Sequence, residues 1–324
     1  MPSLRVGTVA LTLDMGSACQ TWAAVGEPIT VAIARPTRDG AVEVASVETV
    51  DTDEVMTLLQ NVADEVINPR FRSLTAGEIH EKNPGDLVTV ADREAEVLIT
   101  RVLNAVYPDA VVLGEEAYAG DPALMGRYLA ADHAFTVDPV DGTKNFVHGS
   151  ADHAVMVAET RGGQTVRSWI WQPQHGLGYA AELGGGCYRN GVRVSRETPT
   201  ALTDPAELRG RTSKRSWIGA SLDGLSPMTL TWVSCGIDYP KLVEGEADYI
   251  LYRGAAPWDH APGSLMLAEV GGFVGTVGGR AYQPRDNDTG GLIPAASQAA
   301  YDVVLRSLRA SRLLEADRHA VPSD

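Results

Sequence analysis

The 324-residue chain lacks the features that mark several common classes of protein. Its three cysteines are widely spaced and form no C-x-x-C pair, so we expect neither a disulfide framework nor a zinc site. No stretch approaches the roughly 18 consecutive apolar residues of a membrane span. Asp14 interrupts the apolar residues near the N-terminus and no clear cleavage signal follows, so we expect no signal peptide. These absences are typical of a protein of the reducing cytoplasm.

Basic residues are also few. The chain has 27 lysines and arginines against 42 aspartates and glutamates, which gives a net charge of −15. A general nucleic-acid-binding protein presents a basic face, so we expect no nucleic-acid partner, and without a long apolar run we expect no membrane partner. The balance of 44% hydrophobic and 21% charged residues is typical of a soluble globular protein. The acidic excess also suits a pocket that attracts metal cations.

The chain divides into an extension and two lobes. Residues 1–50 show two short β-like runs but no helical period, and we assign this extension no chemical role. Residues 51–195 predict an N-terminal α+β lobe that carries a metal site. Residues 196–324 predict a C-terminal α/β lobe that contributes Asp259 to that site.

Hydrophobic periodicity predicts two helices at the start of the N-terminal lobe. Apolar residues recur at helical spacing over 55–66, and Asp51 and Glu54 are placed as a capping box. A second apolar row over 95–106 ends before a proline. Thr89 is a suitable N-cap for this second helix.

Two short apolar strands are expected next, and each leads into acidic residues. Glu115 and Glu116 follow the strand at 110–113, and Asp138 follows the strand at 134–137. Layered α/β proteins place ligand sites at the carboxyl ends of neighbouring strands. Three further β-like runs predict an antiparallel meander: 153–160, 165–171 and 178–182.

The C-terminal lobe has one clear landmark after a loop-rich stretch. The segment from Trp258 to Gly272 predicts a helix that Asp259 opens and a Gly-Gly pair closes. A last helix is expected over 299–314. The fold class that these elements predict is α/β, in the sense of a mixed α+β layered architecture with two lobes.

The segment D-P-V-D-G-T, which begins at Asp138, places two carboxylates three positions apart. Like charges so close repel each other, so the arrangement makes sense if a cation lies between them. Pro139 favours an extended conformation for the residue before it. We therefore expect a turn that directs both aspartates and the carbonyl of Val140 into one space. The Gly-Thr pair that follows could begin a short helix and bind phosphate through its N–H groups.

Four carboxylates form the candidate ligand set: Glu115, Asp138, Asp141 and Asp259. A set of oxygen ligands without histidine or cysteine favours a hard cation such as Mg²⁺ over zinc or copper. Two such cations a few ångströms apart would activate a water and stabilise a leaving oxygen. Each acidic residue alone is more typical of a turn or a solvated surface, so the prediction depends on their combination.

Four segments together resemble the inositol monophosphatase family of Mg²⁺-dependent, lithium-sensitive phosphatases. They are K-N-P-G-D-L-V-T-V-A-D from Lys82, G-E-E from Gly114, D-P-V-D-G-T-K-N-F-V-H-G from Asp138, and W-D-H-A-P-G…A-E-V-G-G from Trp258. Their order and spacing match the family from about residue 53 to 310. The resemblance implies a layered α-β-α-β-α sandwich of the sugar-phosphatase type, Mg²⁺ as cofactor and a small phosphate ester as substrate. It leaves a homodimer open.

The resemblance also implies a ligand set for each metal ion. Glu115, Asp138 and the carbonyl of Val140 would hold one Mg²⁺. Asp138, Asp141 and Asp259 would hold a second. A third, weaker ion would be held partly through water near Glu115. Glu115 is also counted among the catalytic residues.

Further roles follow from the same resemblance. Asp92 and Thr143 would hydrogen-bond each other and orient the attacking water. The backbone of Gly142 and Thr143 would bind the phosphate, with Asp141 beside it. Lys82 would steady the phosphate or the carboxylates of the metal site.

Two departures from the family pattern concern the substrate. Lys144 follows D-G-T where many inositol-phosphate members have threonine, and Tyr252 stands seven positions before Asp259 where inositol-specific members have glutamate. Arg253 suits an anionic group or a ribose phosphate better than a neutral polyol. Inositol monophosphate, histidinol phosphate, 3′-phosphoadenosine 5′-phosphate and fructose 1,6-bisphosphate stay open as substrates. A non-catalytic cation-binding regulator is the alternative from a different class.

Overall fold

The computed structural model describes residues 51–83, 86–196, 204–286, 290–311 and 313, and the backbone of two short strands that precede them. These strands, β1 (Ala34–Pro36) and β2 (Val42–Val44), pair antiparallel with each other. The rest of the extension lies outside the described residues. In the described part of the chain, no helix combines the length and the apolar character needed to cross a bilayer.

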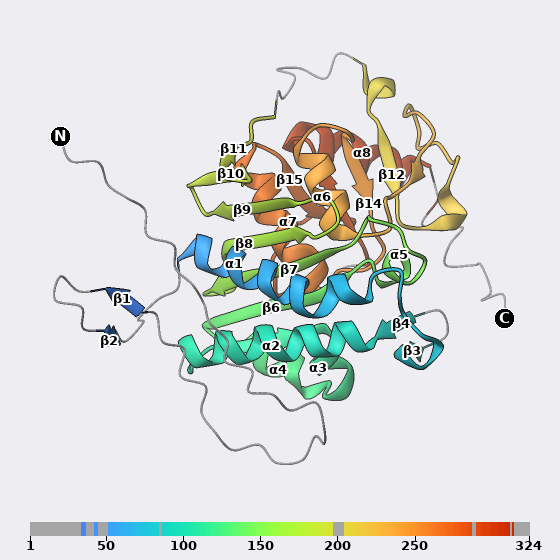
Figure 1. The fold of residues 1–324 in the computed structure, drawn as a ribbon. Helices are drawn as coiled ribbons and strands as arrows, with labels where there is room; N and C mark the ends of the chain where they lie inside the picture. Colours follow the sequence, from blue (N-terminus) through green and yellow to red (C-terminus); the bar gives the residue numbers. More distant parts are fainter. Residues whose placement is uncertain are drawn as a thin grey trace.

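A seven-stranded sheet forms the centre of the first half (Figure 1). Its order is β11-β10-β9-β8-β7-β6-β5, and only the neighbours β5 and β6 run parallel. The strands are β5 (Val111–Gly114), β6 (His133–Asp141), β7 (Ala154–Arg161), β8 (Gln164–Gln172), β9 (Leu177–Glu182), β10 (Gly186–Arg189) and β11 (Val192–Arg193). The predicted meander is therefore confirmed as β7, β8 and β9.

Two helices, α1 (Thr52–Val62) and α2 (Val90–Val106), lie across the front of this sheet in Figure 1. Their apolar rows pack on the sheet in one buried cluster, with Leu59 and Ile99 fully buried. The predicted capping box at the start of α1 is present. The hairpin of β3 (Ile79–Asn83) and β4 (Asp86–Thr89) leads directly into α2.

A middle layer separates this sheet from a second one. It consists of α6 (Cys235–Val243) and α7 (Pro257–Glu269), and α7 packs against strands of both sheets. The two helices approach each other closely, since a Cβ at Gly263 of α7 would collide with the ring of Tyr239 on α6. The chain therefore needs glycine at this crossing. The predicted helix behind the W-D pair is confirmed as α7.

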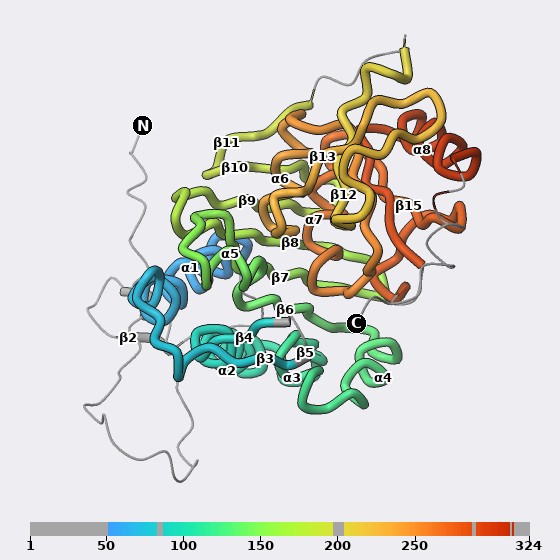
Figure 2. The backbone as a smooth tube through the Cα atoms, turned by 90° about the vertical axis from the view of Figure 1, so that its right-hand side faces the viewer, coloured from blue at the N-terminus to red at the C-terminus, as the bar shows by residue number. Residues whose placement is uncertain are grey.

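The second sheet and an outer helix complete the layers. The sheet has the order β13-β12-β14-β16-β15. Its strands are β12 (Gly210–Thr212), β13 (Thr229–Leu230), β14 (Tyr249–Leu251), β15 (Phe273–Thr276) and β16 (Leu292–Ala295). Helix α8 (Gln298–Ala310) packs on this sheet, and Figure 2 shows it far from α1 and α2.

The layers confirm the predicted α-β-α-β-α sandwich. Helix α8 ends at Ala310, earlier than the expected 314. The division into lobes at residues 195 and 196 stays a prediction.

Candidate active site

Strand β6 carries the acidic pair and differs from the prediction. The predicted turn between Asp138 and Asp141 is wrong, because β6 continues through both residues. Its pairing with β7 shifts register between them. Pro139 has no N–H to donate to the neighbouring strand, and proline in a sheet is tolerated at such irregularities. The turn follows at Gly142, whose φ of 82° is in the left-handed region.

Three carboxylates come together at this irregularity. Asp138 and Asp141 of β6 and Asp259 of the first turn of α7 each place an oxygen within 4.8 Å of the other two. Asp138 is only 2% exposed, and its Oδ1 is buried without a hydrogen-bond partner. An unpaired buried carboxylate is costly unless a cation compensates it. Burial raises the pKa of Asp138, and the nearby charges of Glu115, Asp141 and Asp259 raise it further.

Asp141 is held in place by the start of α6. The Ser234 hydroxyl and the Gly236 N–H, the latter at 2.7 Å, donate to its Oδ2. The Cys235 N–H donates to Oδ1 at 3.1 Å. Burial raises the pKa of Asp141, while these hydrogen bonds lower it. Nothing in the sequence pattern identified these anchoring residues.

Glu115 is the first residue of α3 (Glu115–Gly120) and lies outside the group of three, close enough for its charge to raise the pKa of Asp138 and Asp259. The Lys82 ammonium donates to Glu115 and to Glu116, each at 2.7 Å. Burial raises the pKa of Glu115 to about 7, against the attraction of Lys82. Burial alone would lower the pKa of Lys82, but the two glutamates outweigh it and raise that pKa.

Glu96 binds the first turn of α3, which begins with Glu115, and the sequence did not identify it. It lies on the buried face of α2 and accepts hydrogen bonds from the N–H groups of Glu116 at 2.7 Å and Ala117 at 2.8 Å. Burial raises the pKa of Glu96 to about 7. A carboxylate four positions after Asp92 on an otherwise apolar helix face was the signal that could have identified it.

Asp92 and Thr143 form a second polar unit, beside the cluster of three carboxylates (Asp138, Asp141 and Asp259). Thr89 donates to Asp92 Oδ2 from its N–H at 2.8 Å and its hydroxyl at 2.5 Å. The Thr143 hydroxyl, at the start of α5 (Thr143–Val147), lies 3.0 Å from Asp92 Oδ1 and 3.0 Å from the carbonyl oxygen of Val140. Burial raises the pKa of Asp92 to about 6, although the Thr89 bonds lower it.

A cavity of about 300 Å³ opens onto this cluster and has Asp141 and Asp259 in its wall. Tyr252 also lines it, and its hydroxyl donates at 2.8 Å to the buried carboxylate of Asp238. Burial raises the pKa of Asp238 to about 8. Arg253 is exposed beside Tyr252 and does not line the cavity, so its role in substrate binding stays a prediction.

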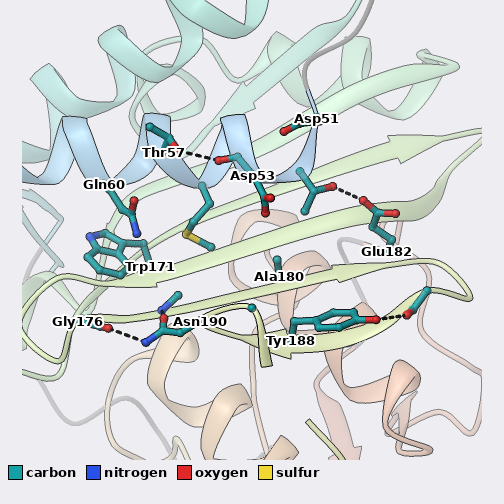
Figure 3. Close-up of a pocket in the computed structure, with 15 residues that line it drawn as sticks. Asp51, Asp53, Thr57, Gln60, Trp171, Gly176, Ala180, Glu182, Tyr188 and Asn190 are labelled. Carbon is teal, nitrogen blue, oxygen red and sulfur yellow. Dashed lines mark hydrogen bonds between the residues drawn. The ribbon is translucent and has the colours of Figure 1, made fainter. Parts of the chain in front are cut away.

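A larger cavity of about 850 Å³ lies elsewhere, between α1 and strands β8 to β10 (Figure 3). Met56, Trp171 and Ala180 give it an apolar wall. Its acidic residues include Asp53 and Glu182, and none of the three clustered carboxylates is in its lining. The chemistry expected of paired metal ions therefore belongs to the smaller cavity.

Comparisons with known proteins agree with this geometry. The model of the inositol monophosphatase family matches residues 48–313. An inositol-1-monophosphatase of Mesorhizobium japonicum is 30% identical over 269 residues, which cover 78% of this chain and 96% of the relative. The Nus factor SuhB of Pseudomonas aeruginosa is 28% identical over 65% of this chain and 80% of its own.

A solved structure also shares the fold. An IMPase/NADP phosphatase in complex with Mg²⁺ and phosphate superposes with a TM-score of 0.65. The match covers 80% of this chain and 95% of that protein, at 22% sequence identity.

Proposed function

The chain belongs to the inositol monophosphatase family and is a phosphoric monoester hydrolase, and we propose that it removes phosphate from a small metabolite with Mg²⁺ as cofactor. One observation carries the proposal about the site. Asp138, Asp141 and Asp259 come from distant parts of the chain and gather their oxygens within 4.8 Å. Three negative charges so close repel each other, and folding gains nothing from holding them together. A bound cation would offset that repulsion.

The residues fit magnesium. All candidate ligands bind through oxygen atoms. The Oδ1 of Asp138, which has no hydrogen-bond partner, is available as a ligand atom. Asp138, Asp141 and Asp259 would hold one ion, and Glu115, Asp138 and the Val140 carbonyl another. When bound, Mg²⁺ lowers the pKa of a water molecule and stabilises negative charge on phosphate oxygens. The similar IMPase/NADP phosphatase, which contains Mg²⁺ and phosphate, supports this assignment.

The chain's own residues would position the nucleophile. Thr143 has a single hydroxyl proton, and an ionised Asp92 at 3.0 Å accepts it. The oxygen lone pairs of Thr143 then stay available to accept a hydrogen bond from the attacking water. The N–H groups of Gly142 and Thr143 would bind the phosphate, and Lys82 would hold Glu115 and Glu116 in place.

The substrate within the family stays a choice among several esters. Inositol monophosphate is the default, because the Mesorhizobium japonicum relative is named an inositol-1-monophosphatase. Tyr252 stands where the resemblance leads us to expect glutamate, and it binds Asp238. The alternatives are histidinol phosphate, 3′-phosphoadenosine 5′-phosphate and fructose 1,6-bisphosphate.

A non-catalytic regulator is the rival function. The relative named Nus factor SuhB is the reason to consider it, since that name does not describe a phosphatase. The three carboxylates that gather within 4.8 Å, together with the Asp92–Thr143 pair, favour catalysis, since a regulator has no use for a pair that orients water.

Phosphate release with Mg²⁺ tests the proposal. We expect turnover of a panel of small phosphate esters, loss of turnover in EDTA, and a fall of at least about 100-fold in Asp138→Asn. Far-UV circular dichroism should show the variant folded. Asp109→Asn, at an exposed position, is the matched control and should retain activity. If the Asp138→Asn variant keeps its activity, the proposed site is contradicted.

A further inference from the structure

The second sheet forms part of the wall of the 300 Å³ cavity that Asp141 and Asp259 line. Strands β12, β13 and β14 run parallel, so their carboxyl ends lie at one edge. Residues just after these ends line the cavity: Arg215 follows β12, Thr231 follows β13 and Tyr252 follows β14. The carboxyl ends of parallel strands are where α/β sheets bind ligands. The cavity therefore extends from the three carboxylates to a second, separately built wall.

Two cations lie in the lining of this cavity. Arg215 opens a short 3₁₀ turn (Arg215–Trp217), and Lys144 lies on α5. Within the described residues, neither side chain forms an ion pair or a hydrogen bond. By contrast, Arg196 and Arg209 share one carboxylate at Asp248. Both residues are exposed, and in a chain with a net charge of −15 they bring two positive charges to the wall of one cavity.

The backbones that carry the two cations are anchored. On α5, the Asn145 side-chain amide donates to the Trp232 carbonyl at 2.8 Å and to the Asp152 carbonyl at 2.7 Å. In the 3₁₀ turn, Trp217 is buried, with the Lys214 ammonium 4.9 Å above its ring. The fold therefore sets the backbone positions of Lys144 and Arg215 relative to the carboxylates.

We propose that Lys144 and Arg215 bind a second anionic group on the alcohol part of the substrate. This inference rests on the proposed function, which places the reacting phosphate at Asp138, Asp141 and Asp259. The remainder of the ester then extends into the cavity that Asp141 and Asp259 share with the two cations. A guanidinium matches the geometry of a carboxylate or a phosphate. The substrate class is a phosphate monoester that carries a further carboxylate or phosphate, rather than a neutral polyol phosphate.

Matched pairs of esters test this preference. Glycerol 3-phosphate against 3-phosphoglycerate adds a carboxylate, and fructose 1-phosphate against fructose 1,6-bisphosphate adds a phosphate. We expect at least one doubly anionic member to have a kcat/KM about 10-fold or more above that of its partner, the size expected of one charge-assisted hydrogen bond. The pair that responds identifies the anion. The preference should weaken at high ionic strength, because salt screens exposed charges.

Variants locate the effect. Arg215→Gln and Lys144→Gln should each lower the ratio of kcat/KM between the members of the responding pair by about 10-fold, mainly through KM. Arg215→Glu should lower that ratio further, because a like charge then faces the second anion. Arg101→Gln, on the exposed face of α2, is the matched control and should leave the ratio unchanged.

The outcomes separate this inference from the proposed function. Phosphate release with Mg²⁺ from all four esters, with ratios near one that Arg215→Gln and Lys144→Gln do not change, would overturn the second-anion site and leave the phosphatase assignment intact. No release in the presence of Mg²⁺ from these four esters, from inositol monophosphate, from histidinol phosphate or from 3′-phosphoadenosine 5′-phosphate would overturn both. An altered ratio in Arg101→Gln would also overturn the inference, because the effect would then not belong to the cavity.

Discussion

Replacing Asp92 with asparagine should make the metal-free protein more stable and the enzyme far less active. Asp92 is fully buried, and burial raises its pKa from 3.8 to about 6. Each pKa unit corresponds to about 1.4 kcal/mol, so the ionised carboxylate costs the folded state about 3 kcal/mol. The cost is fully present above pH 6. It fades as pH falls towards 3.8, because the folded state takes up a proton that the unfolded state does not hold.

Asparagine preserves the shape of the site but reverses one hydrogen bond. Its amide oxygen can accept from both donor groups of Thr89, as Asp92 Oδ2 does. Its amide N–H₂ then faces Thr143 and donates, so the Thr143 hydroxyl must direct its proton to the Val140 carbonyl instead. We expect kcat to fall by about 10² to 10⁴, the range of a lost acid–base or positioning group.

Thermal unfolding in EDTA measures the stability of the variant. At pH 8 the melting temperature of Asp92→Asn should rise by roughly 6–12 °C, if about 3 kcal/mol is converted at 2–4 °C per kcal/mol. At pH 5 the rise should be about half as large, because most wild-type molecules then carry a protonated Asp92. The exposed Asp109→Asn variant should change neither quantity. A lower melting temperature at pH 8, or turnover within tenfold of wild type, would refute the reasoning.

Three further predictions concern the metal ions and the cavity wall. Mg²⁺ at 100 times its dissociation constant should stabilise the wild type by about 2.7 kcal/mol, and scanning fluorimetry should show most of this gain lost in Asp138→Asn; a retained gain would place the ion elsewhere. Tyr252→Phe removes the donor to Asp238 and should lower the free energy of unfolding by about 1–3 kcal/mol in urea; an unchanged midpoint would mean that the bond is replaced. Lithium at millimolar concentration should inhibit phosphate release, and insensitivity over that range would place the chain outside the lithium-sensitive branch.

The parts of the fold that sequence predicts well depend on neighbouring residues. The predicted capping box at Asp51 and the predicted N-cap at Thr89 are present, because a cap joins groups only two or three positions apart. The meander of β7 to β9 follows from short connections, because strands joined by a short loop pair antiparallel with each other. The acidic ends of β5 and β6 predicted a ligand site for the same reason, since parallel neighbours end at one edge.

The parts that sequence does not predict depend on distant contacts. Asp141 is anchored by Ser234 and Gly236, 93 and 95 positions away, and only the packing of α6 on the first sheet brings them together. The irregularity between Asp138 and Asp141 also needs the partner strand to define its register. A Pro within an acidic segment is compatible with either a turn or a bulge, and the sequence alone favoured the turn.

The position of Asp259 has a consequence for the growing polypeptide. Asp138 and Asp141 emerge from the ribosome more than a hundred residues before Asp259, which lies at the start of the helix shared by both sheets. A nascent chain that ends before this helix lacks Asp259, so it has an incomplete set of ligands for a divalent ion. Once α7 docks, an ion bound there becomes a staple between early and late segments, and chelation should loosen the two halves together.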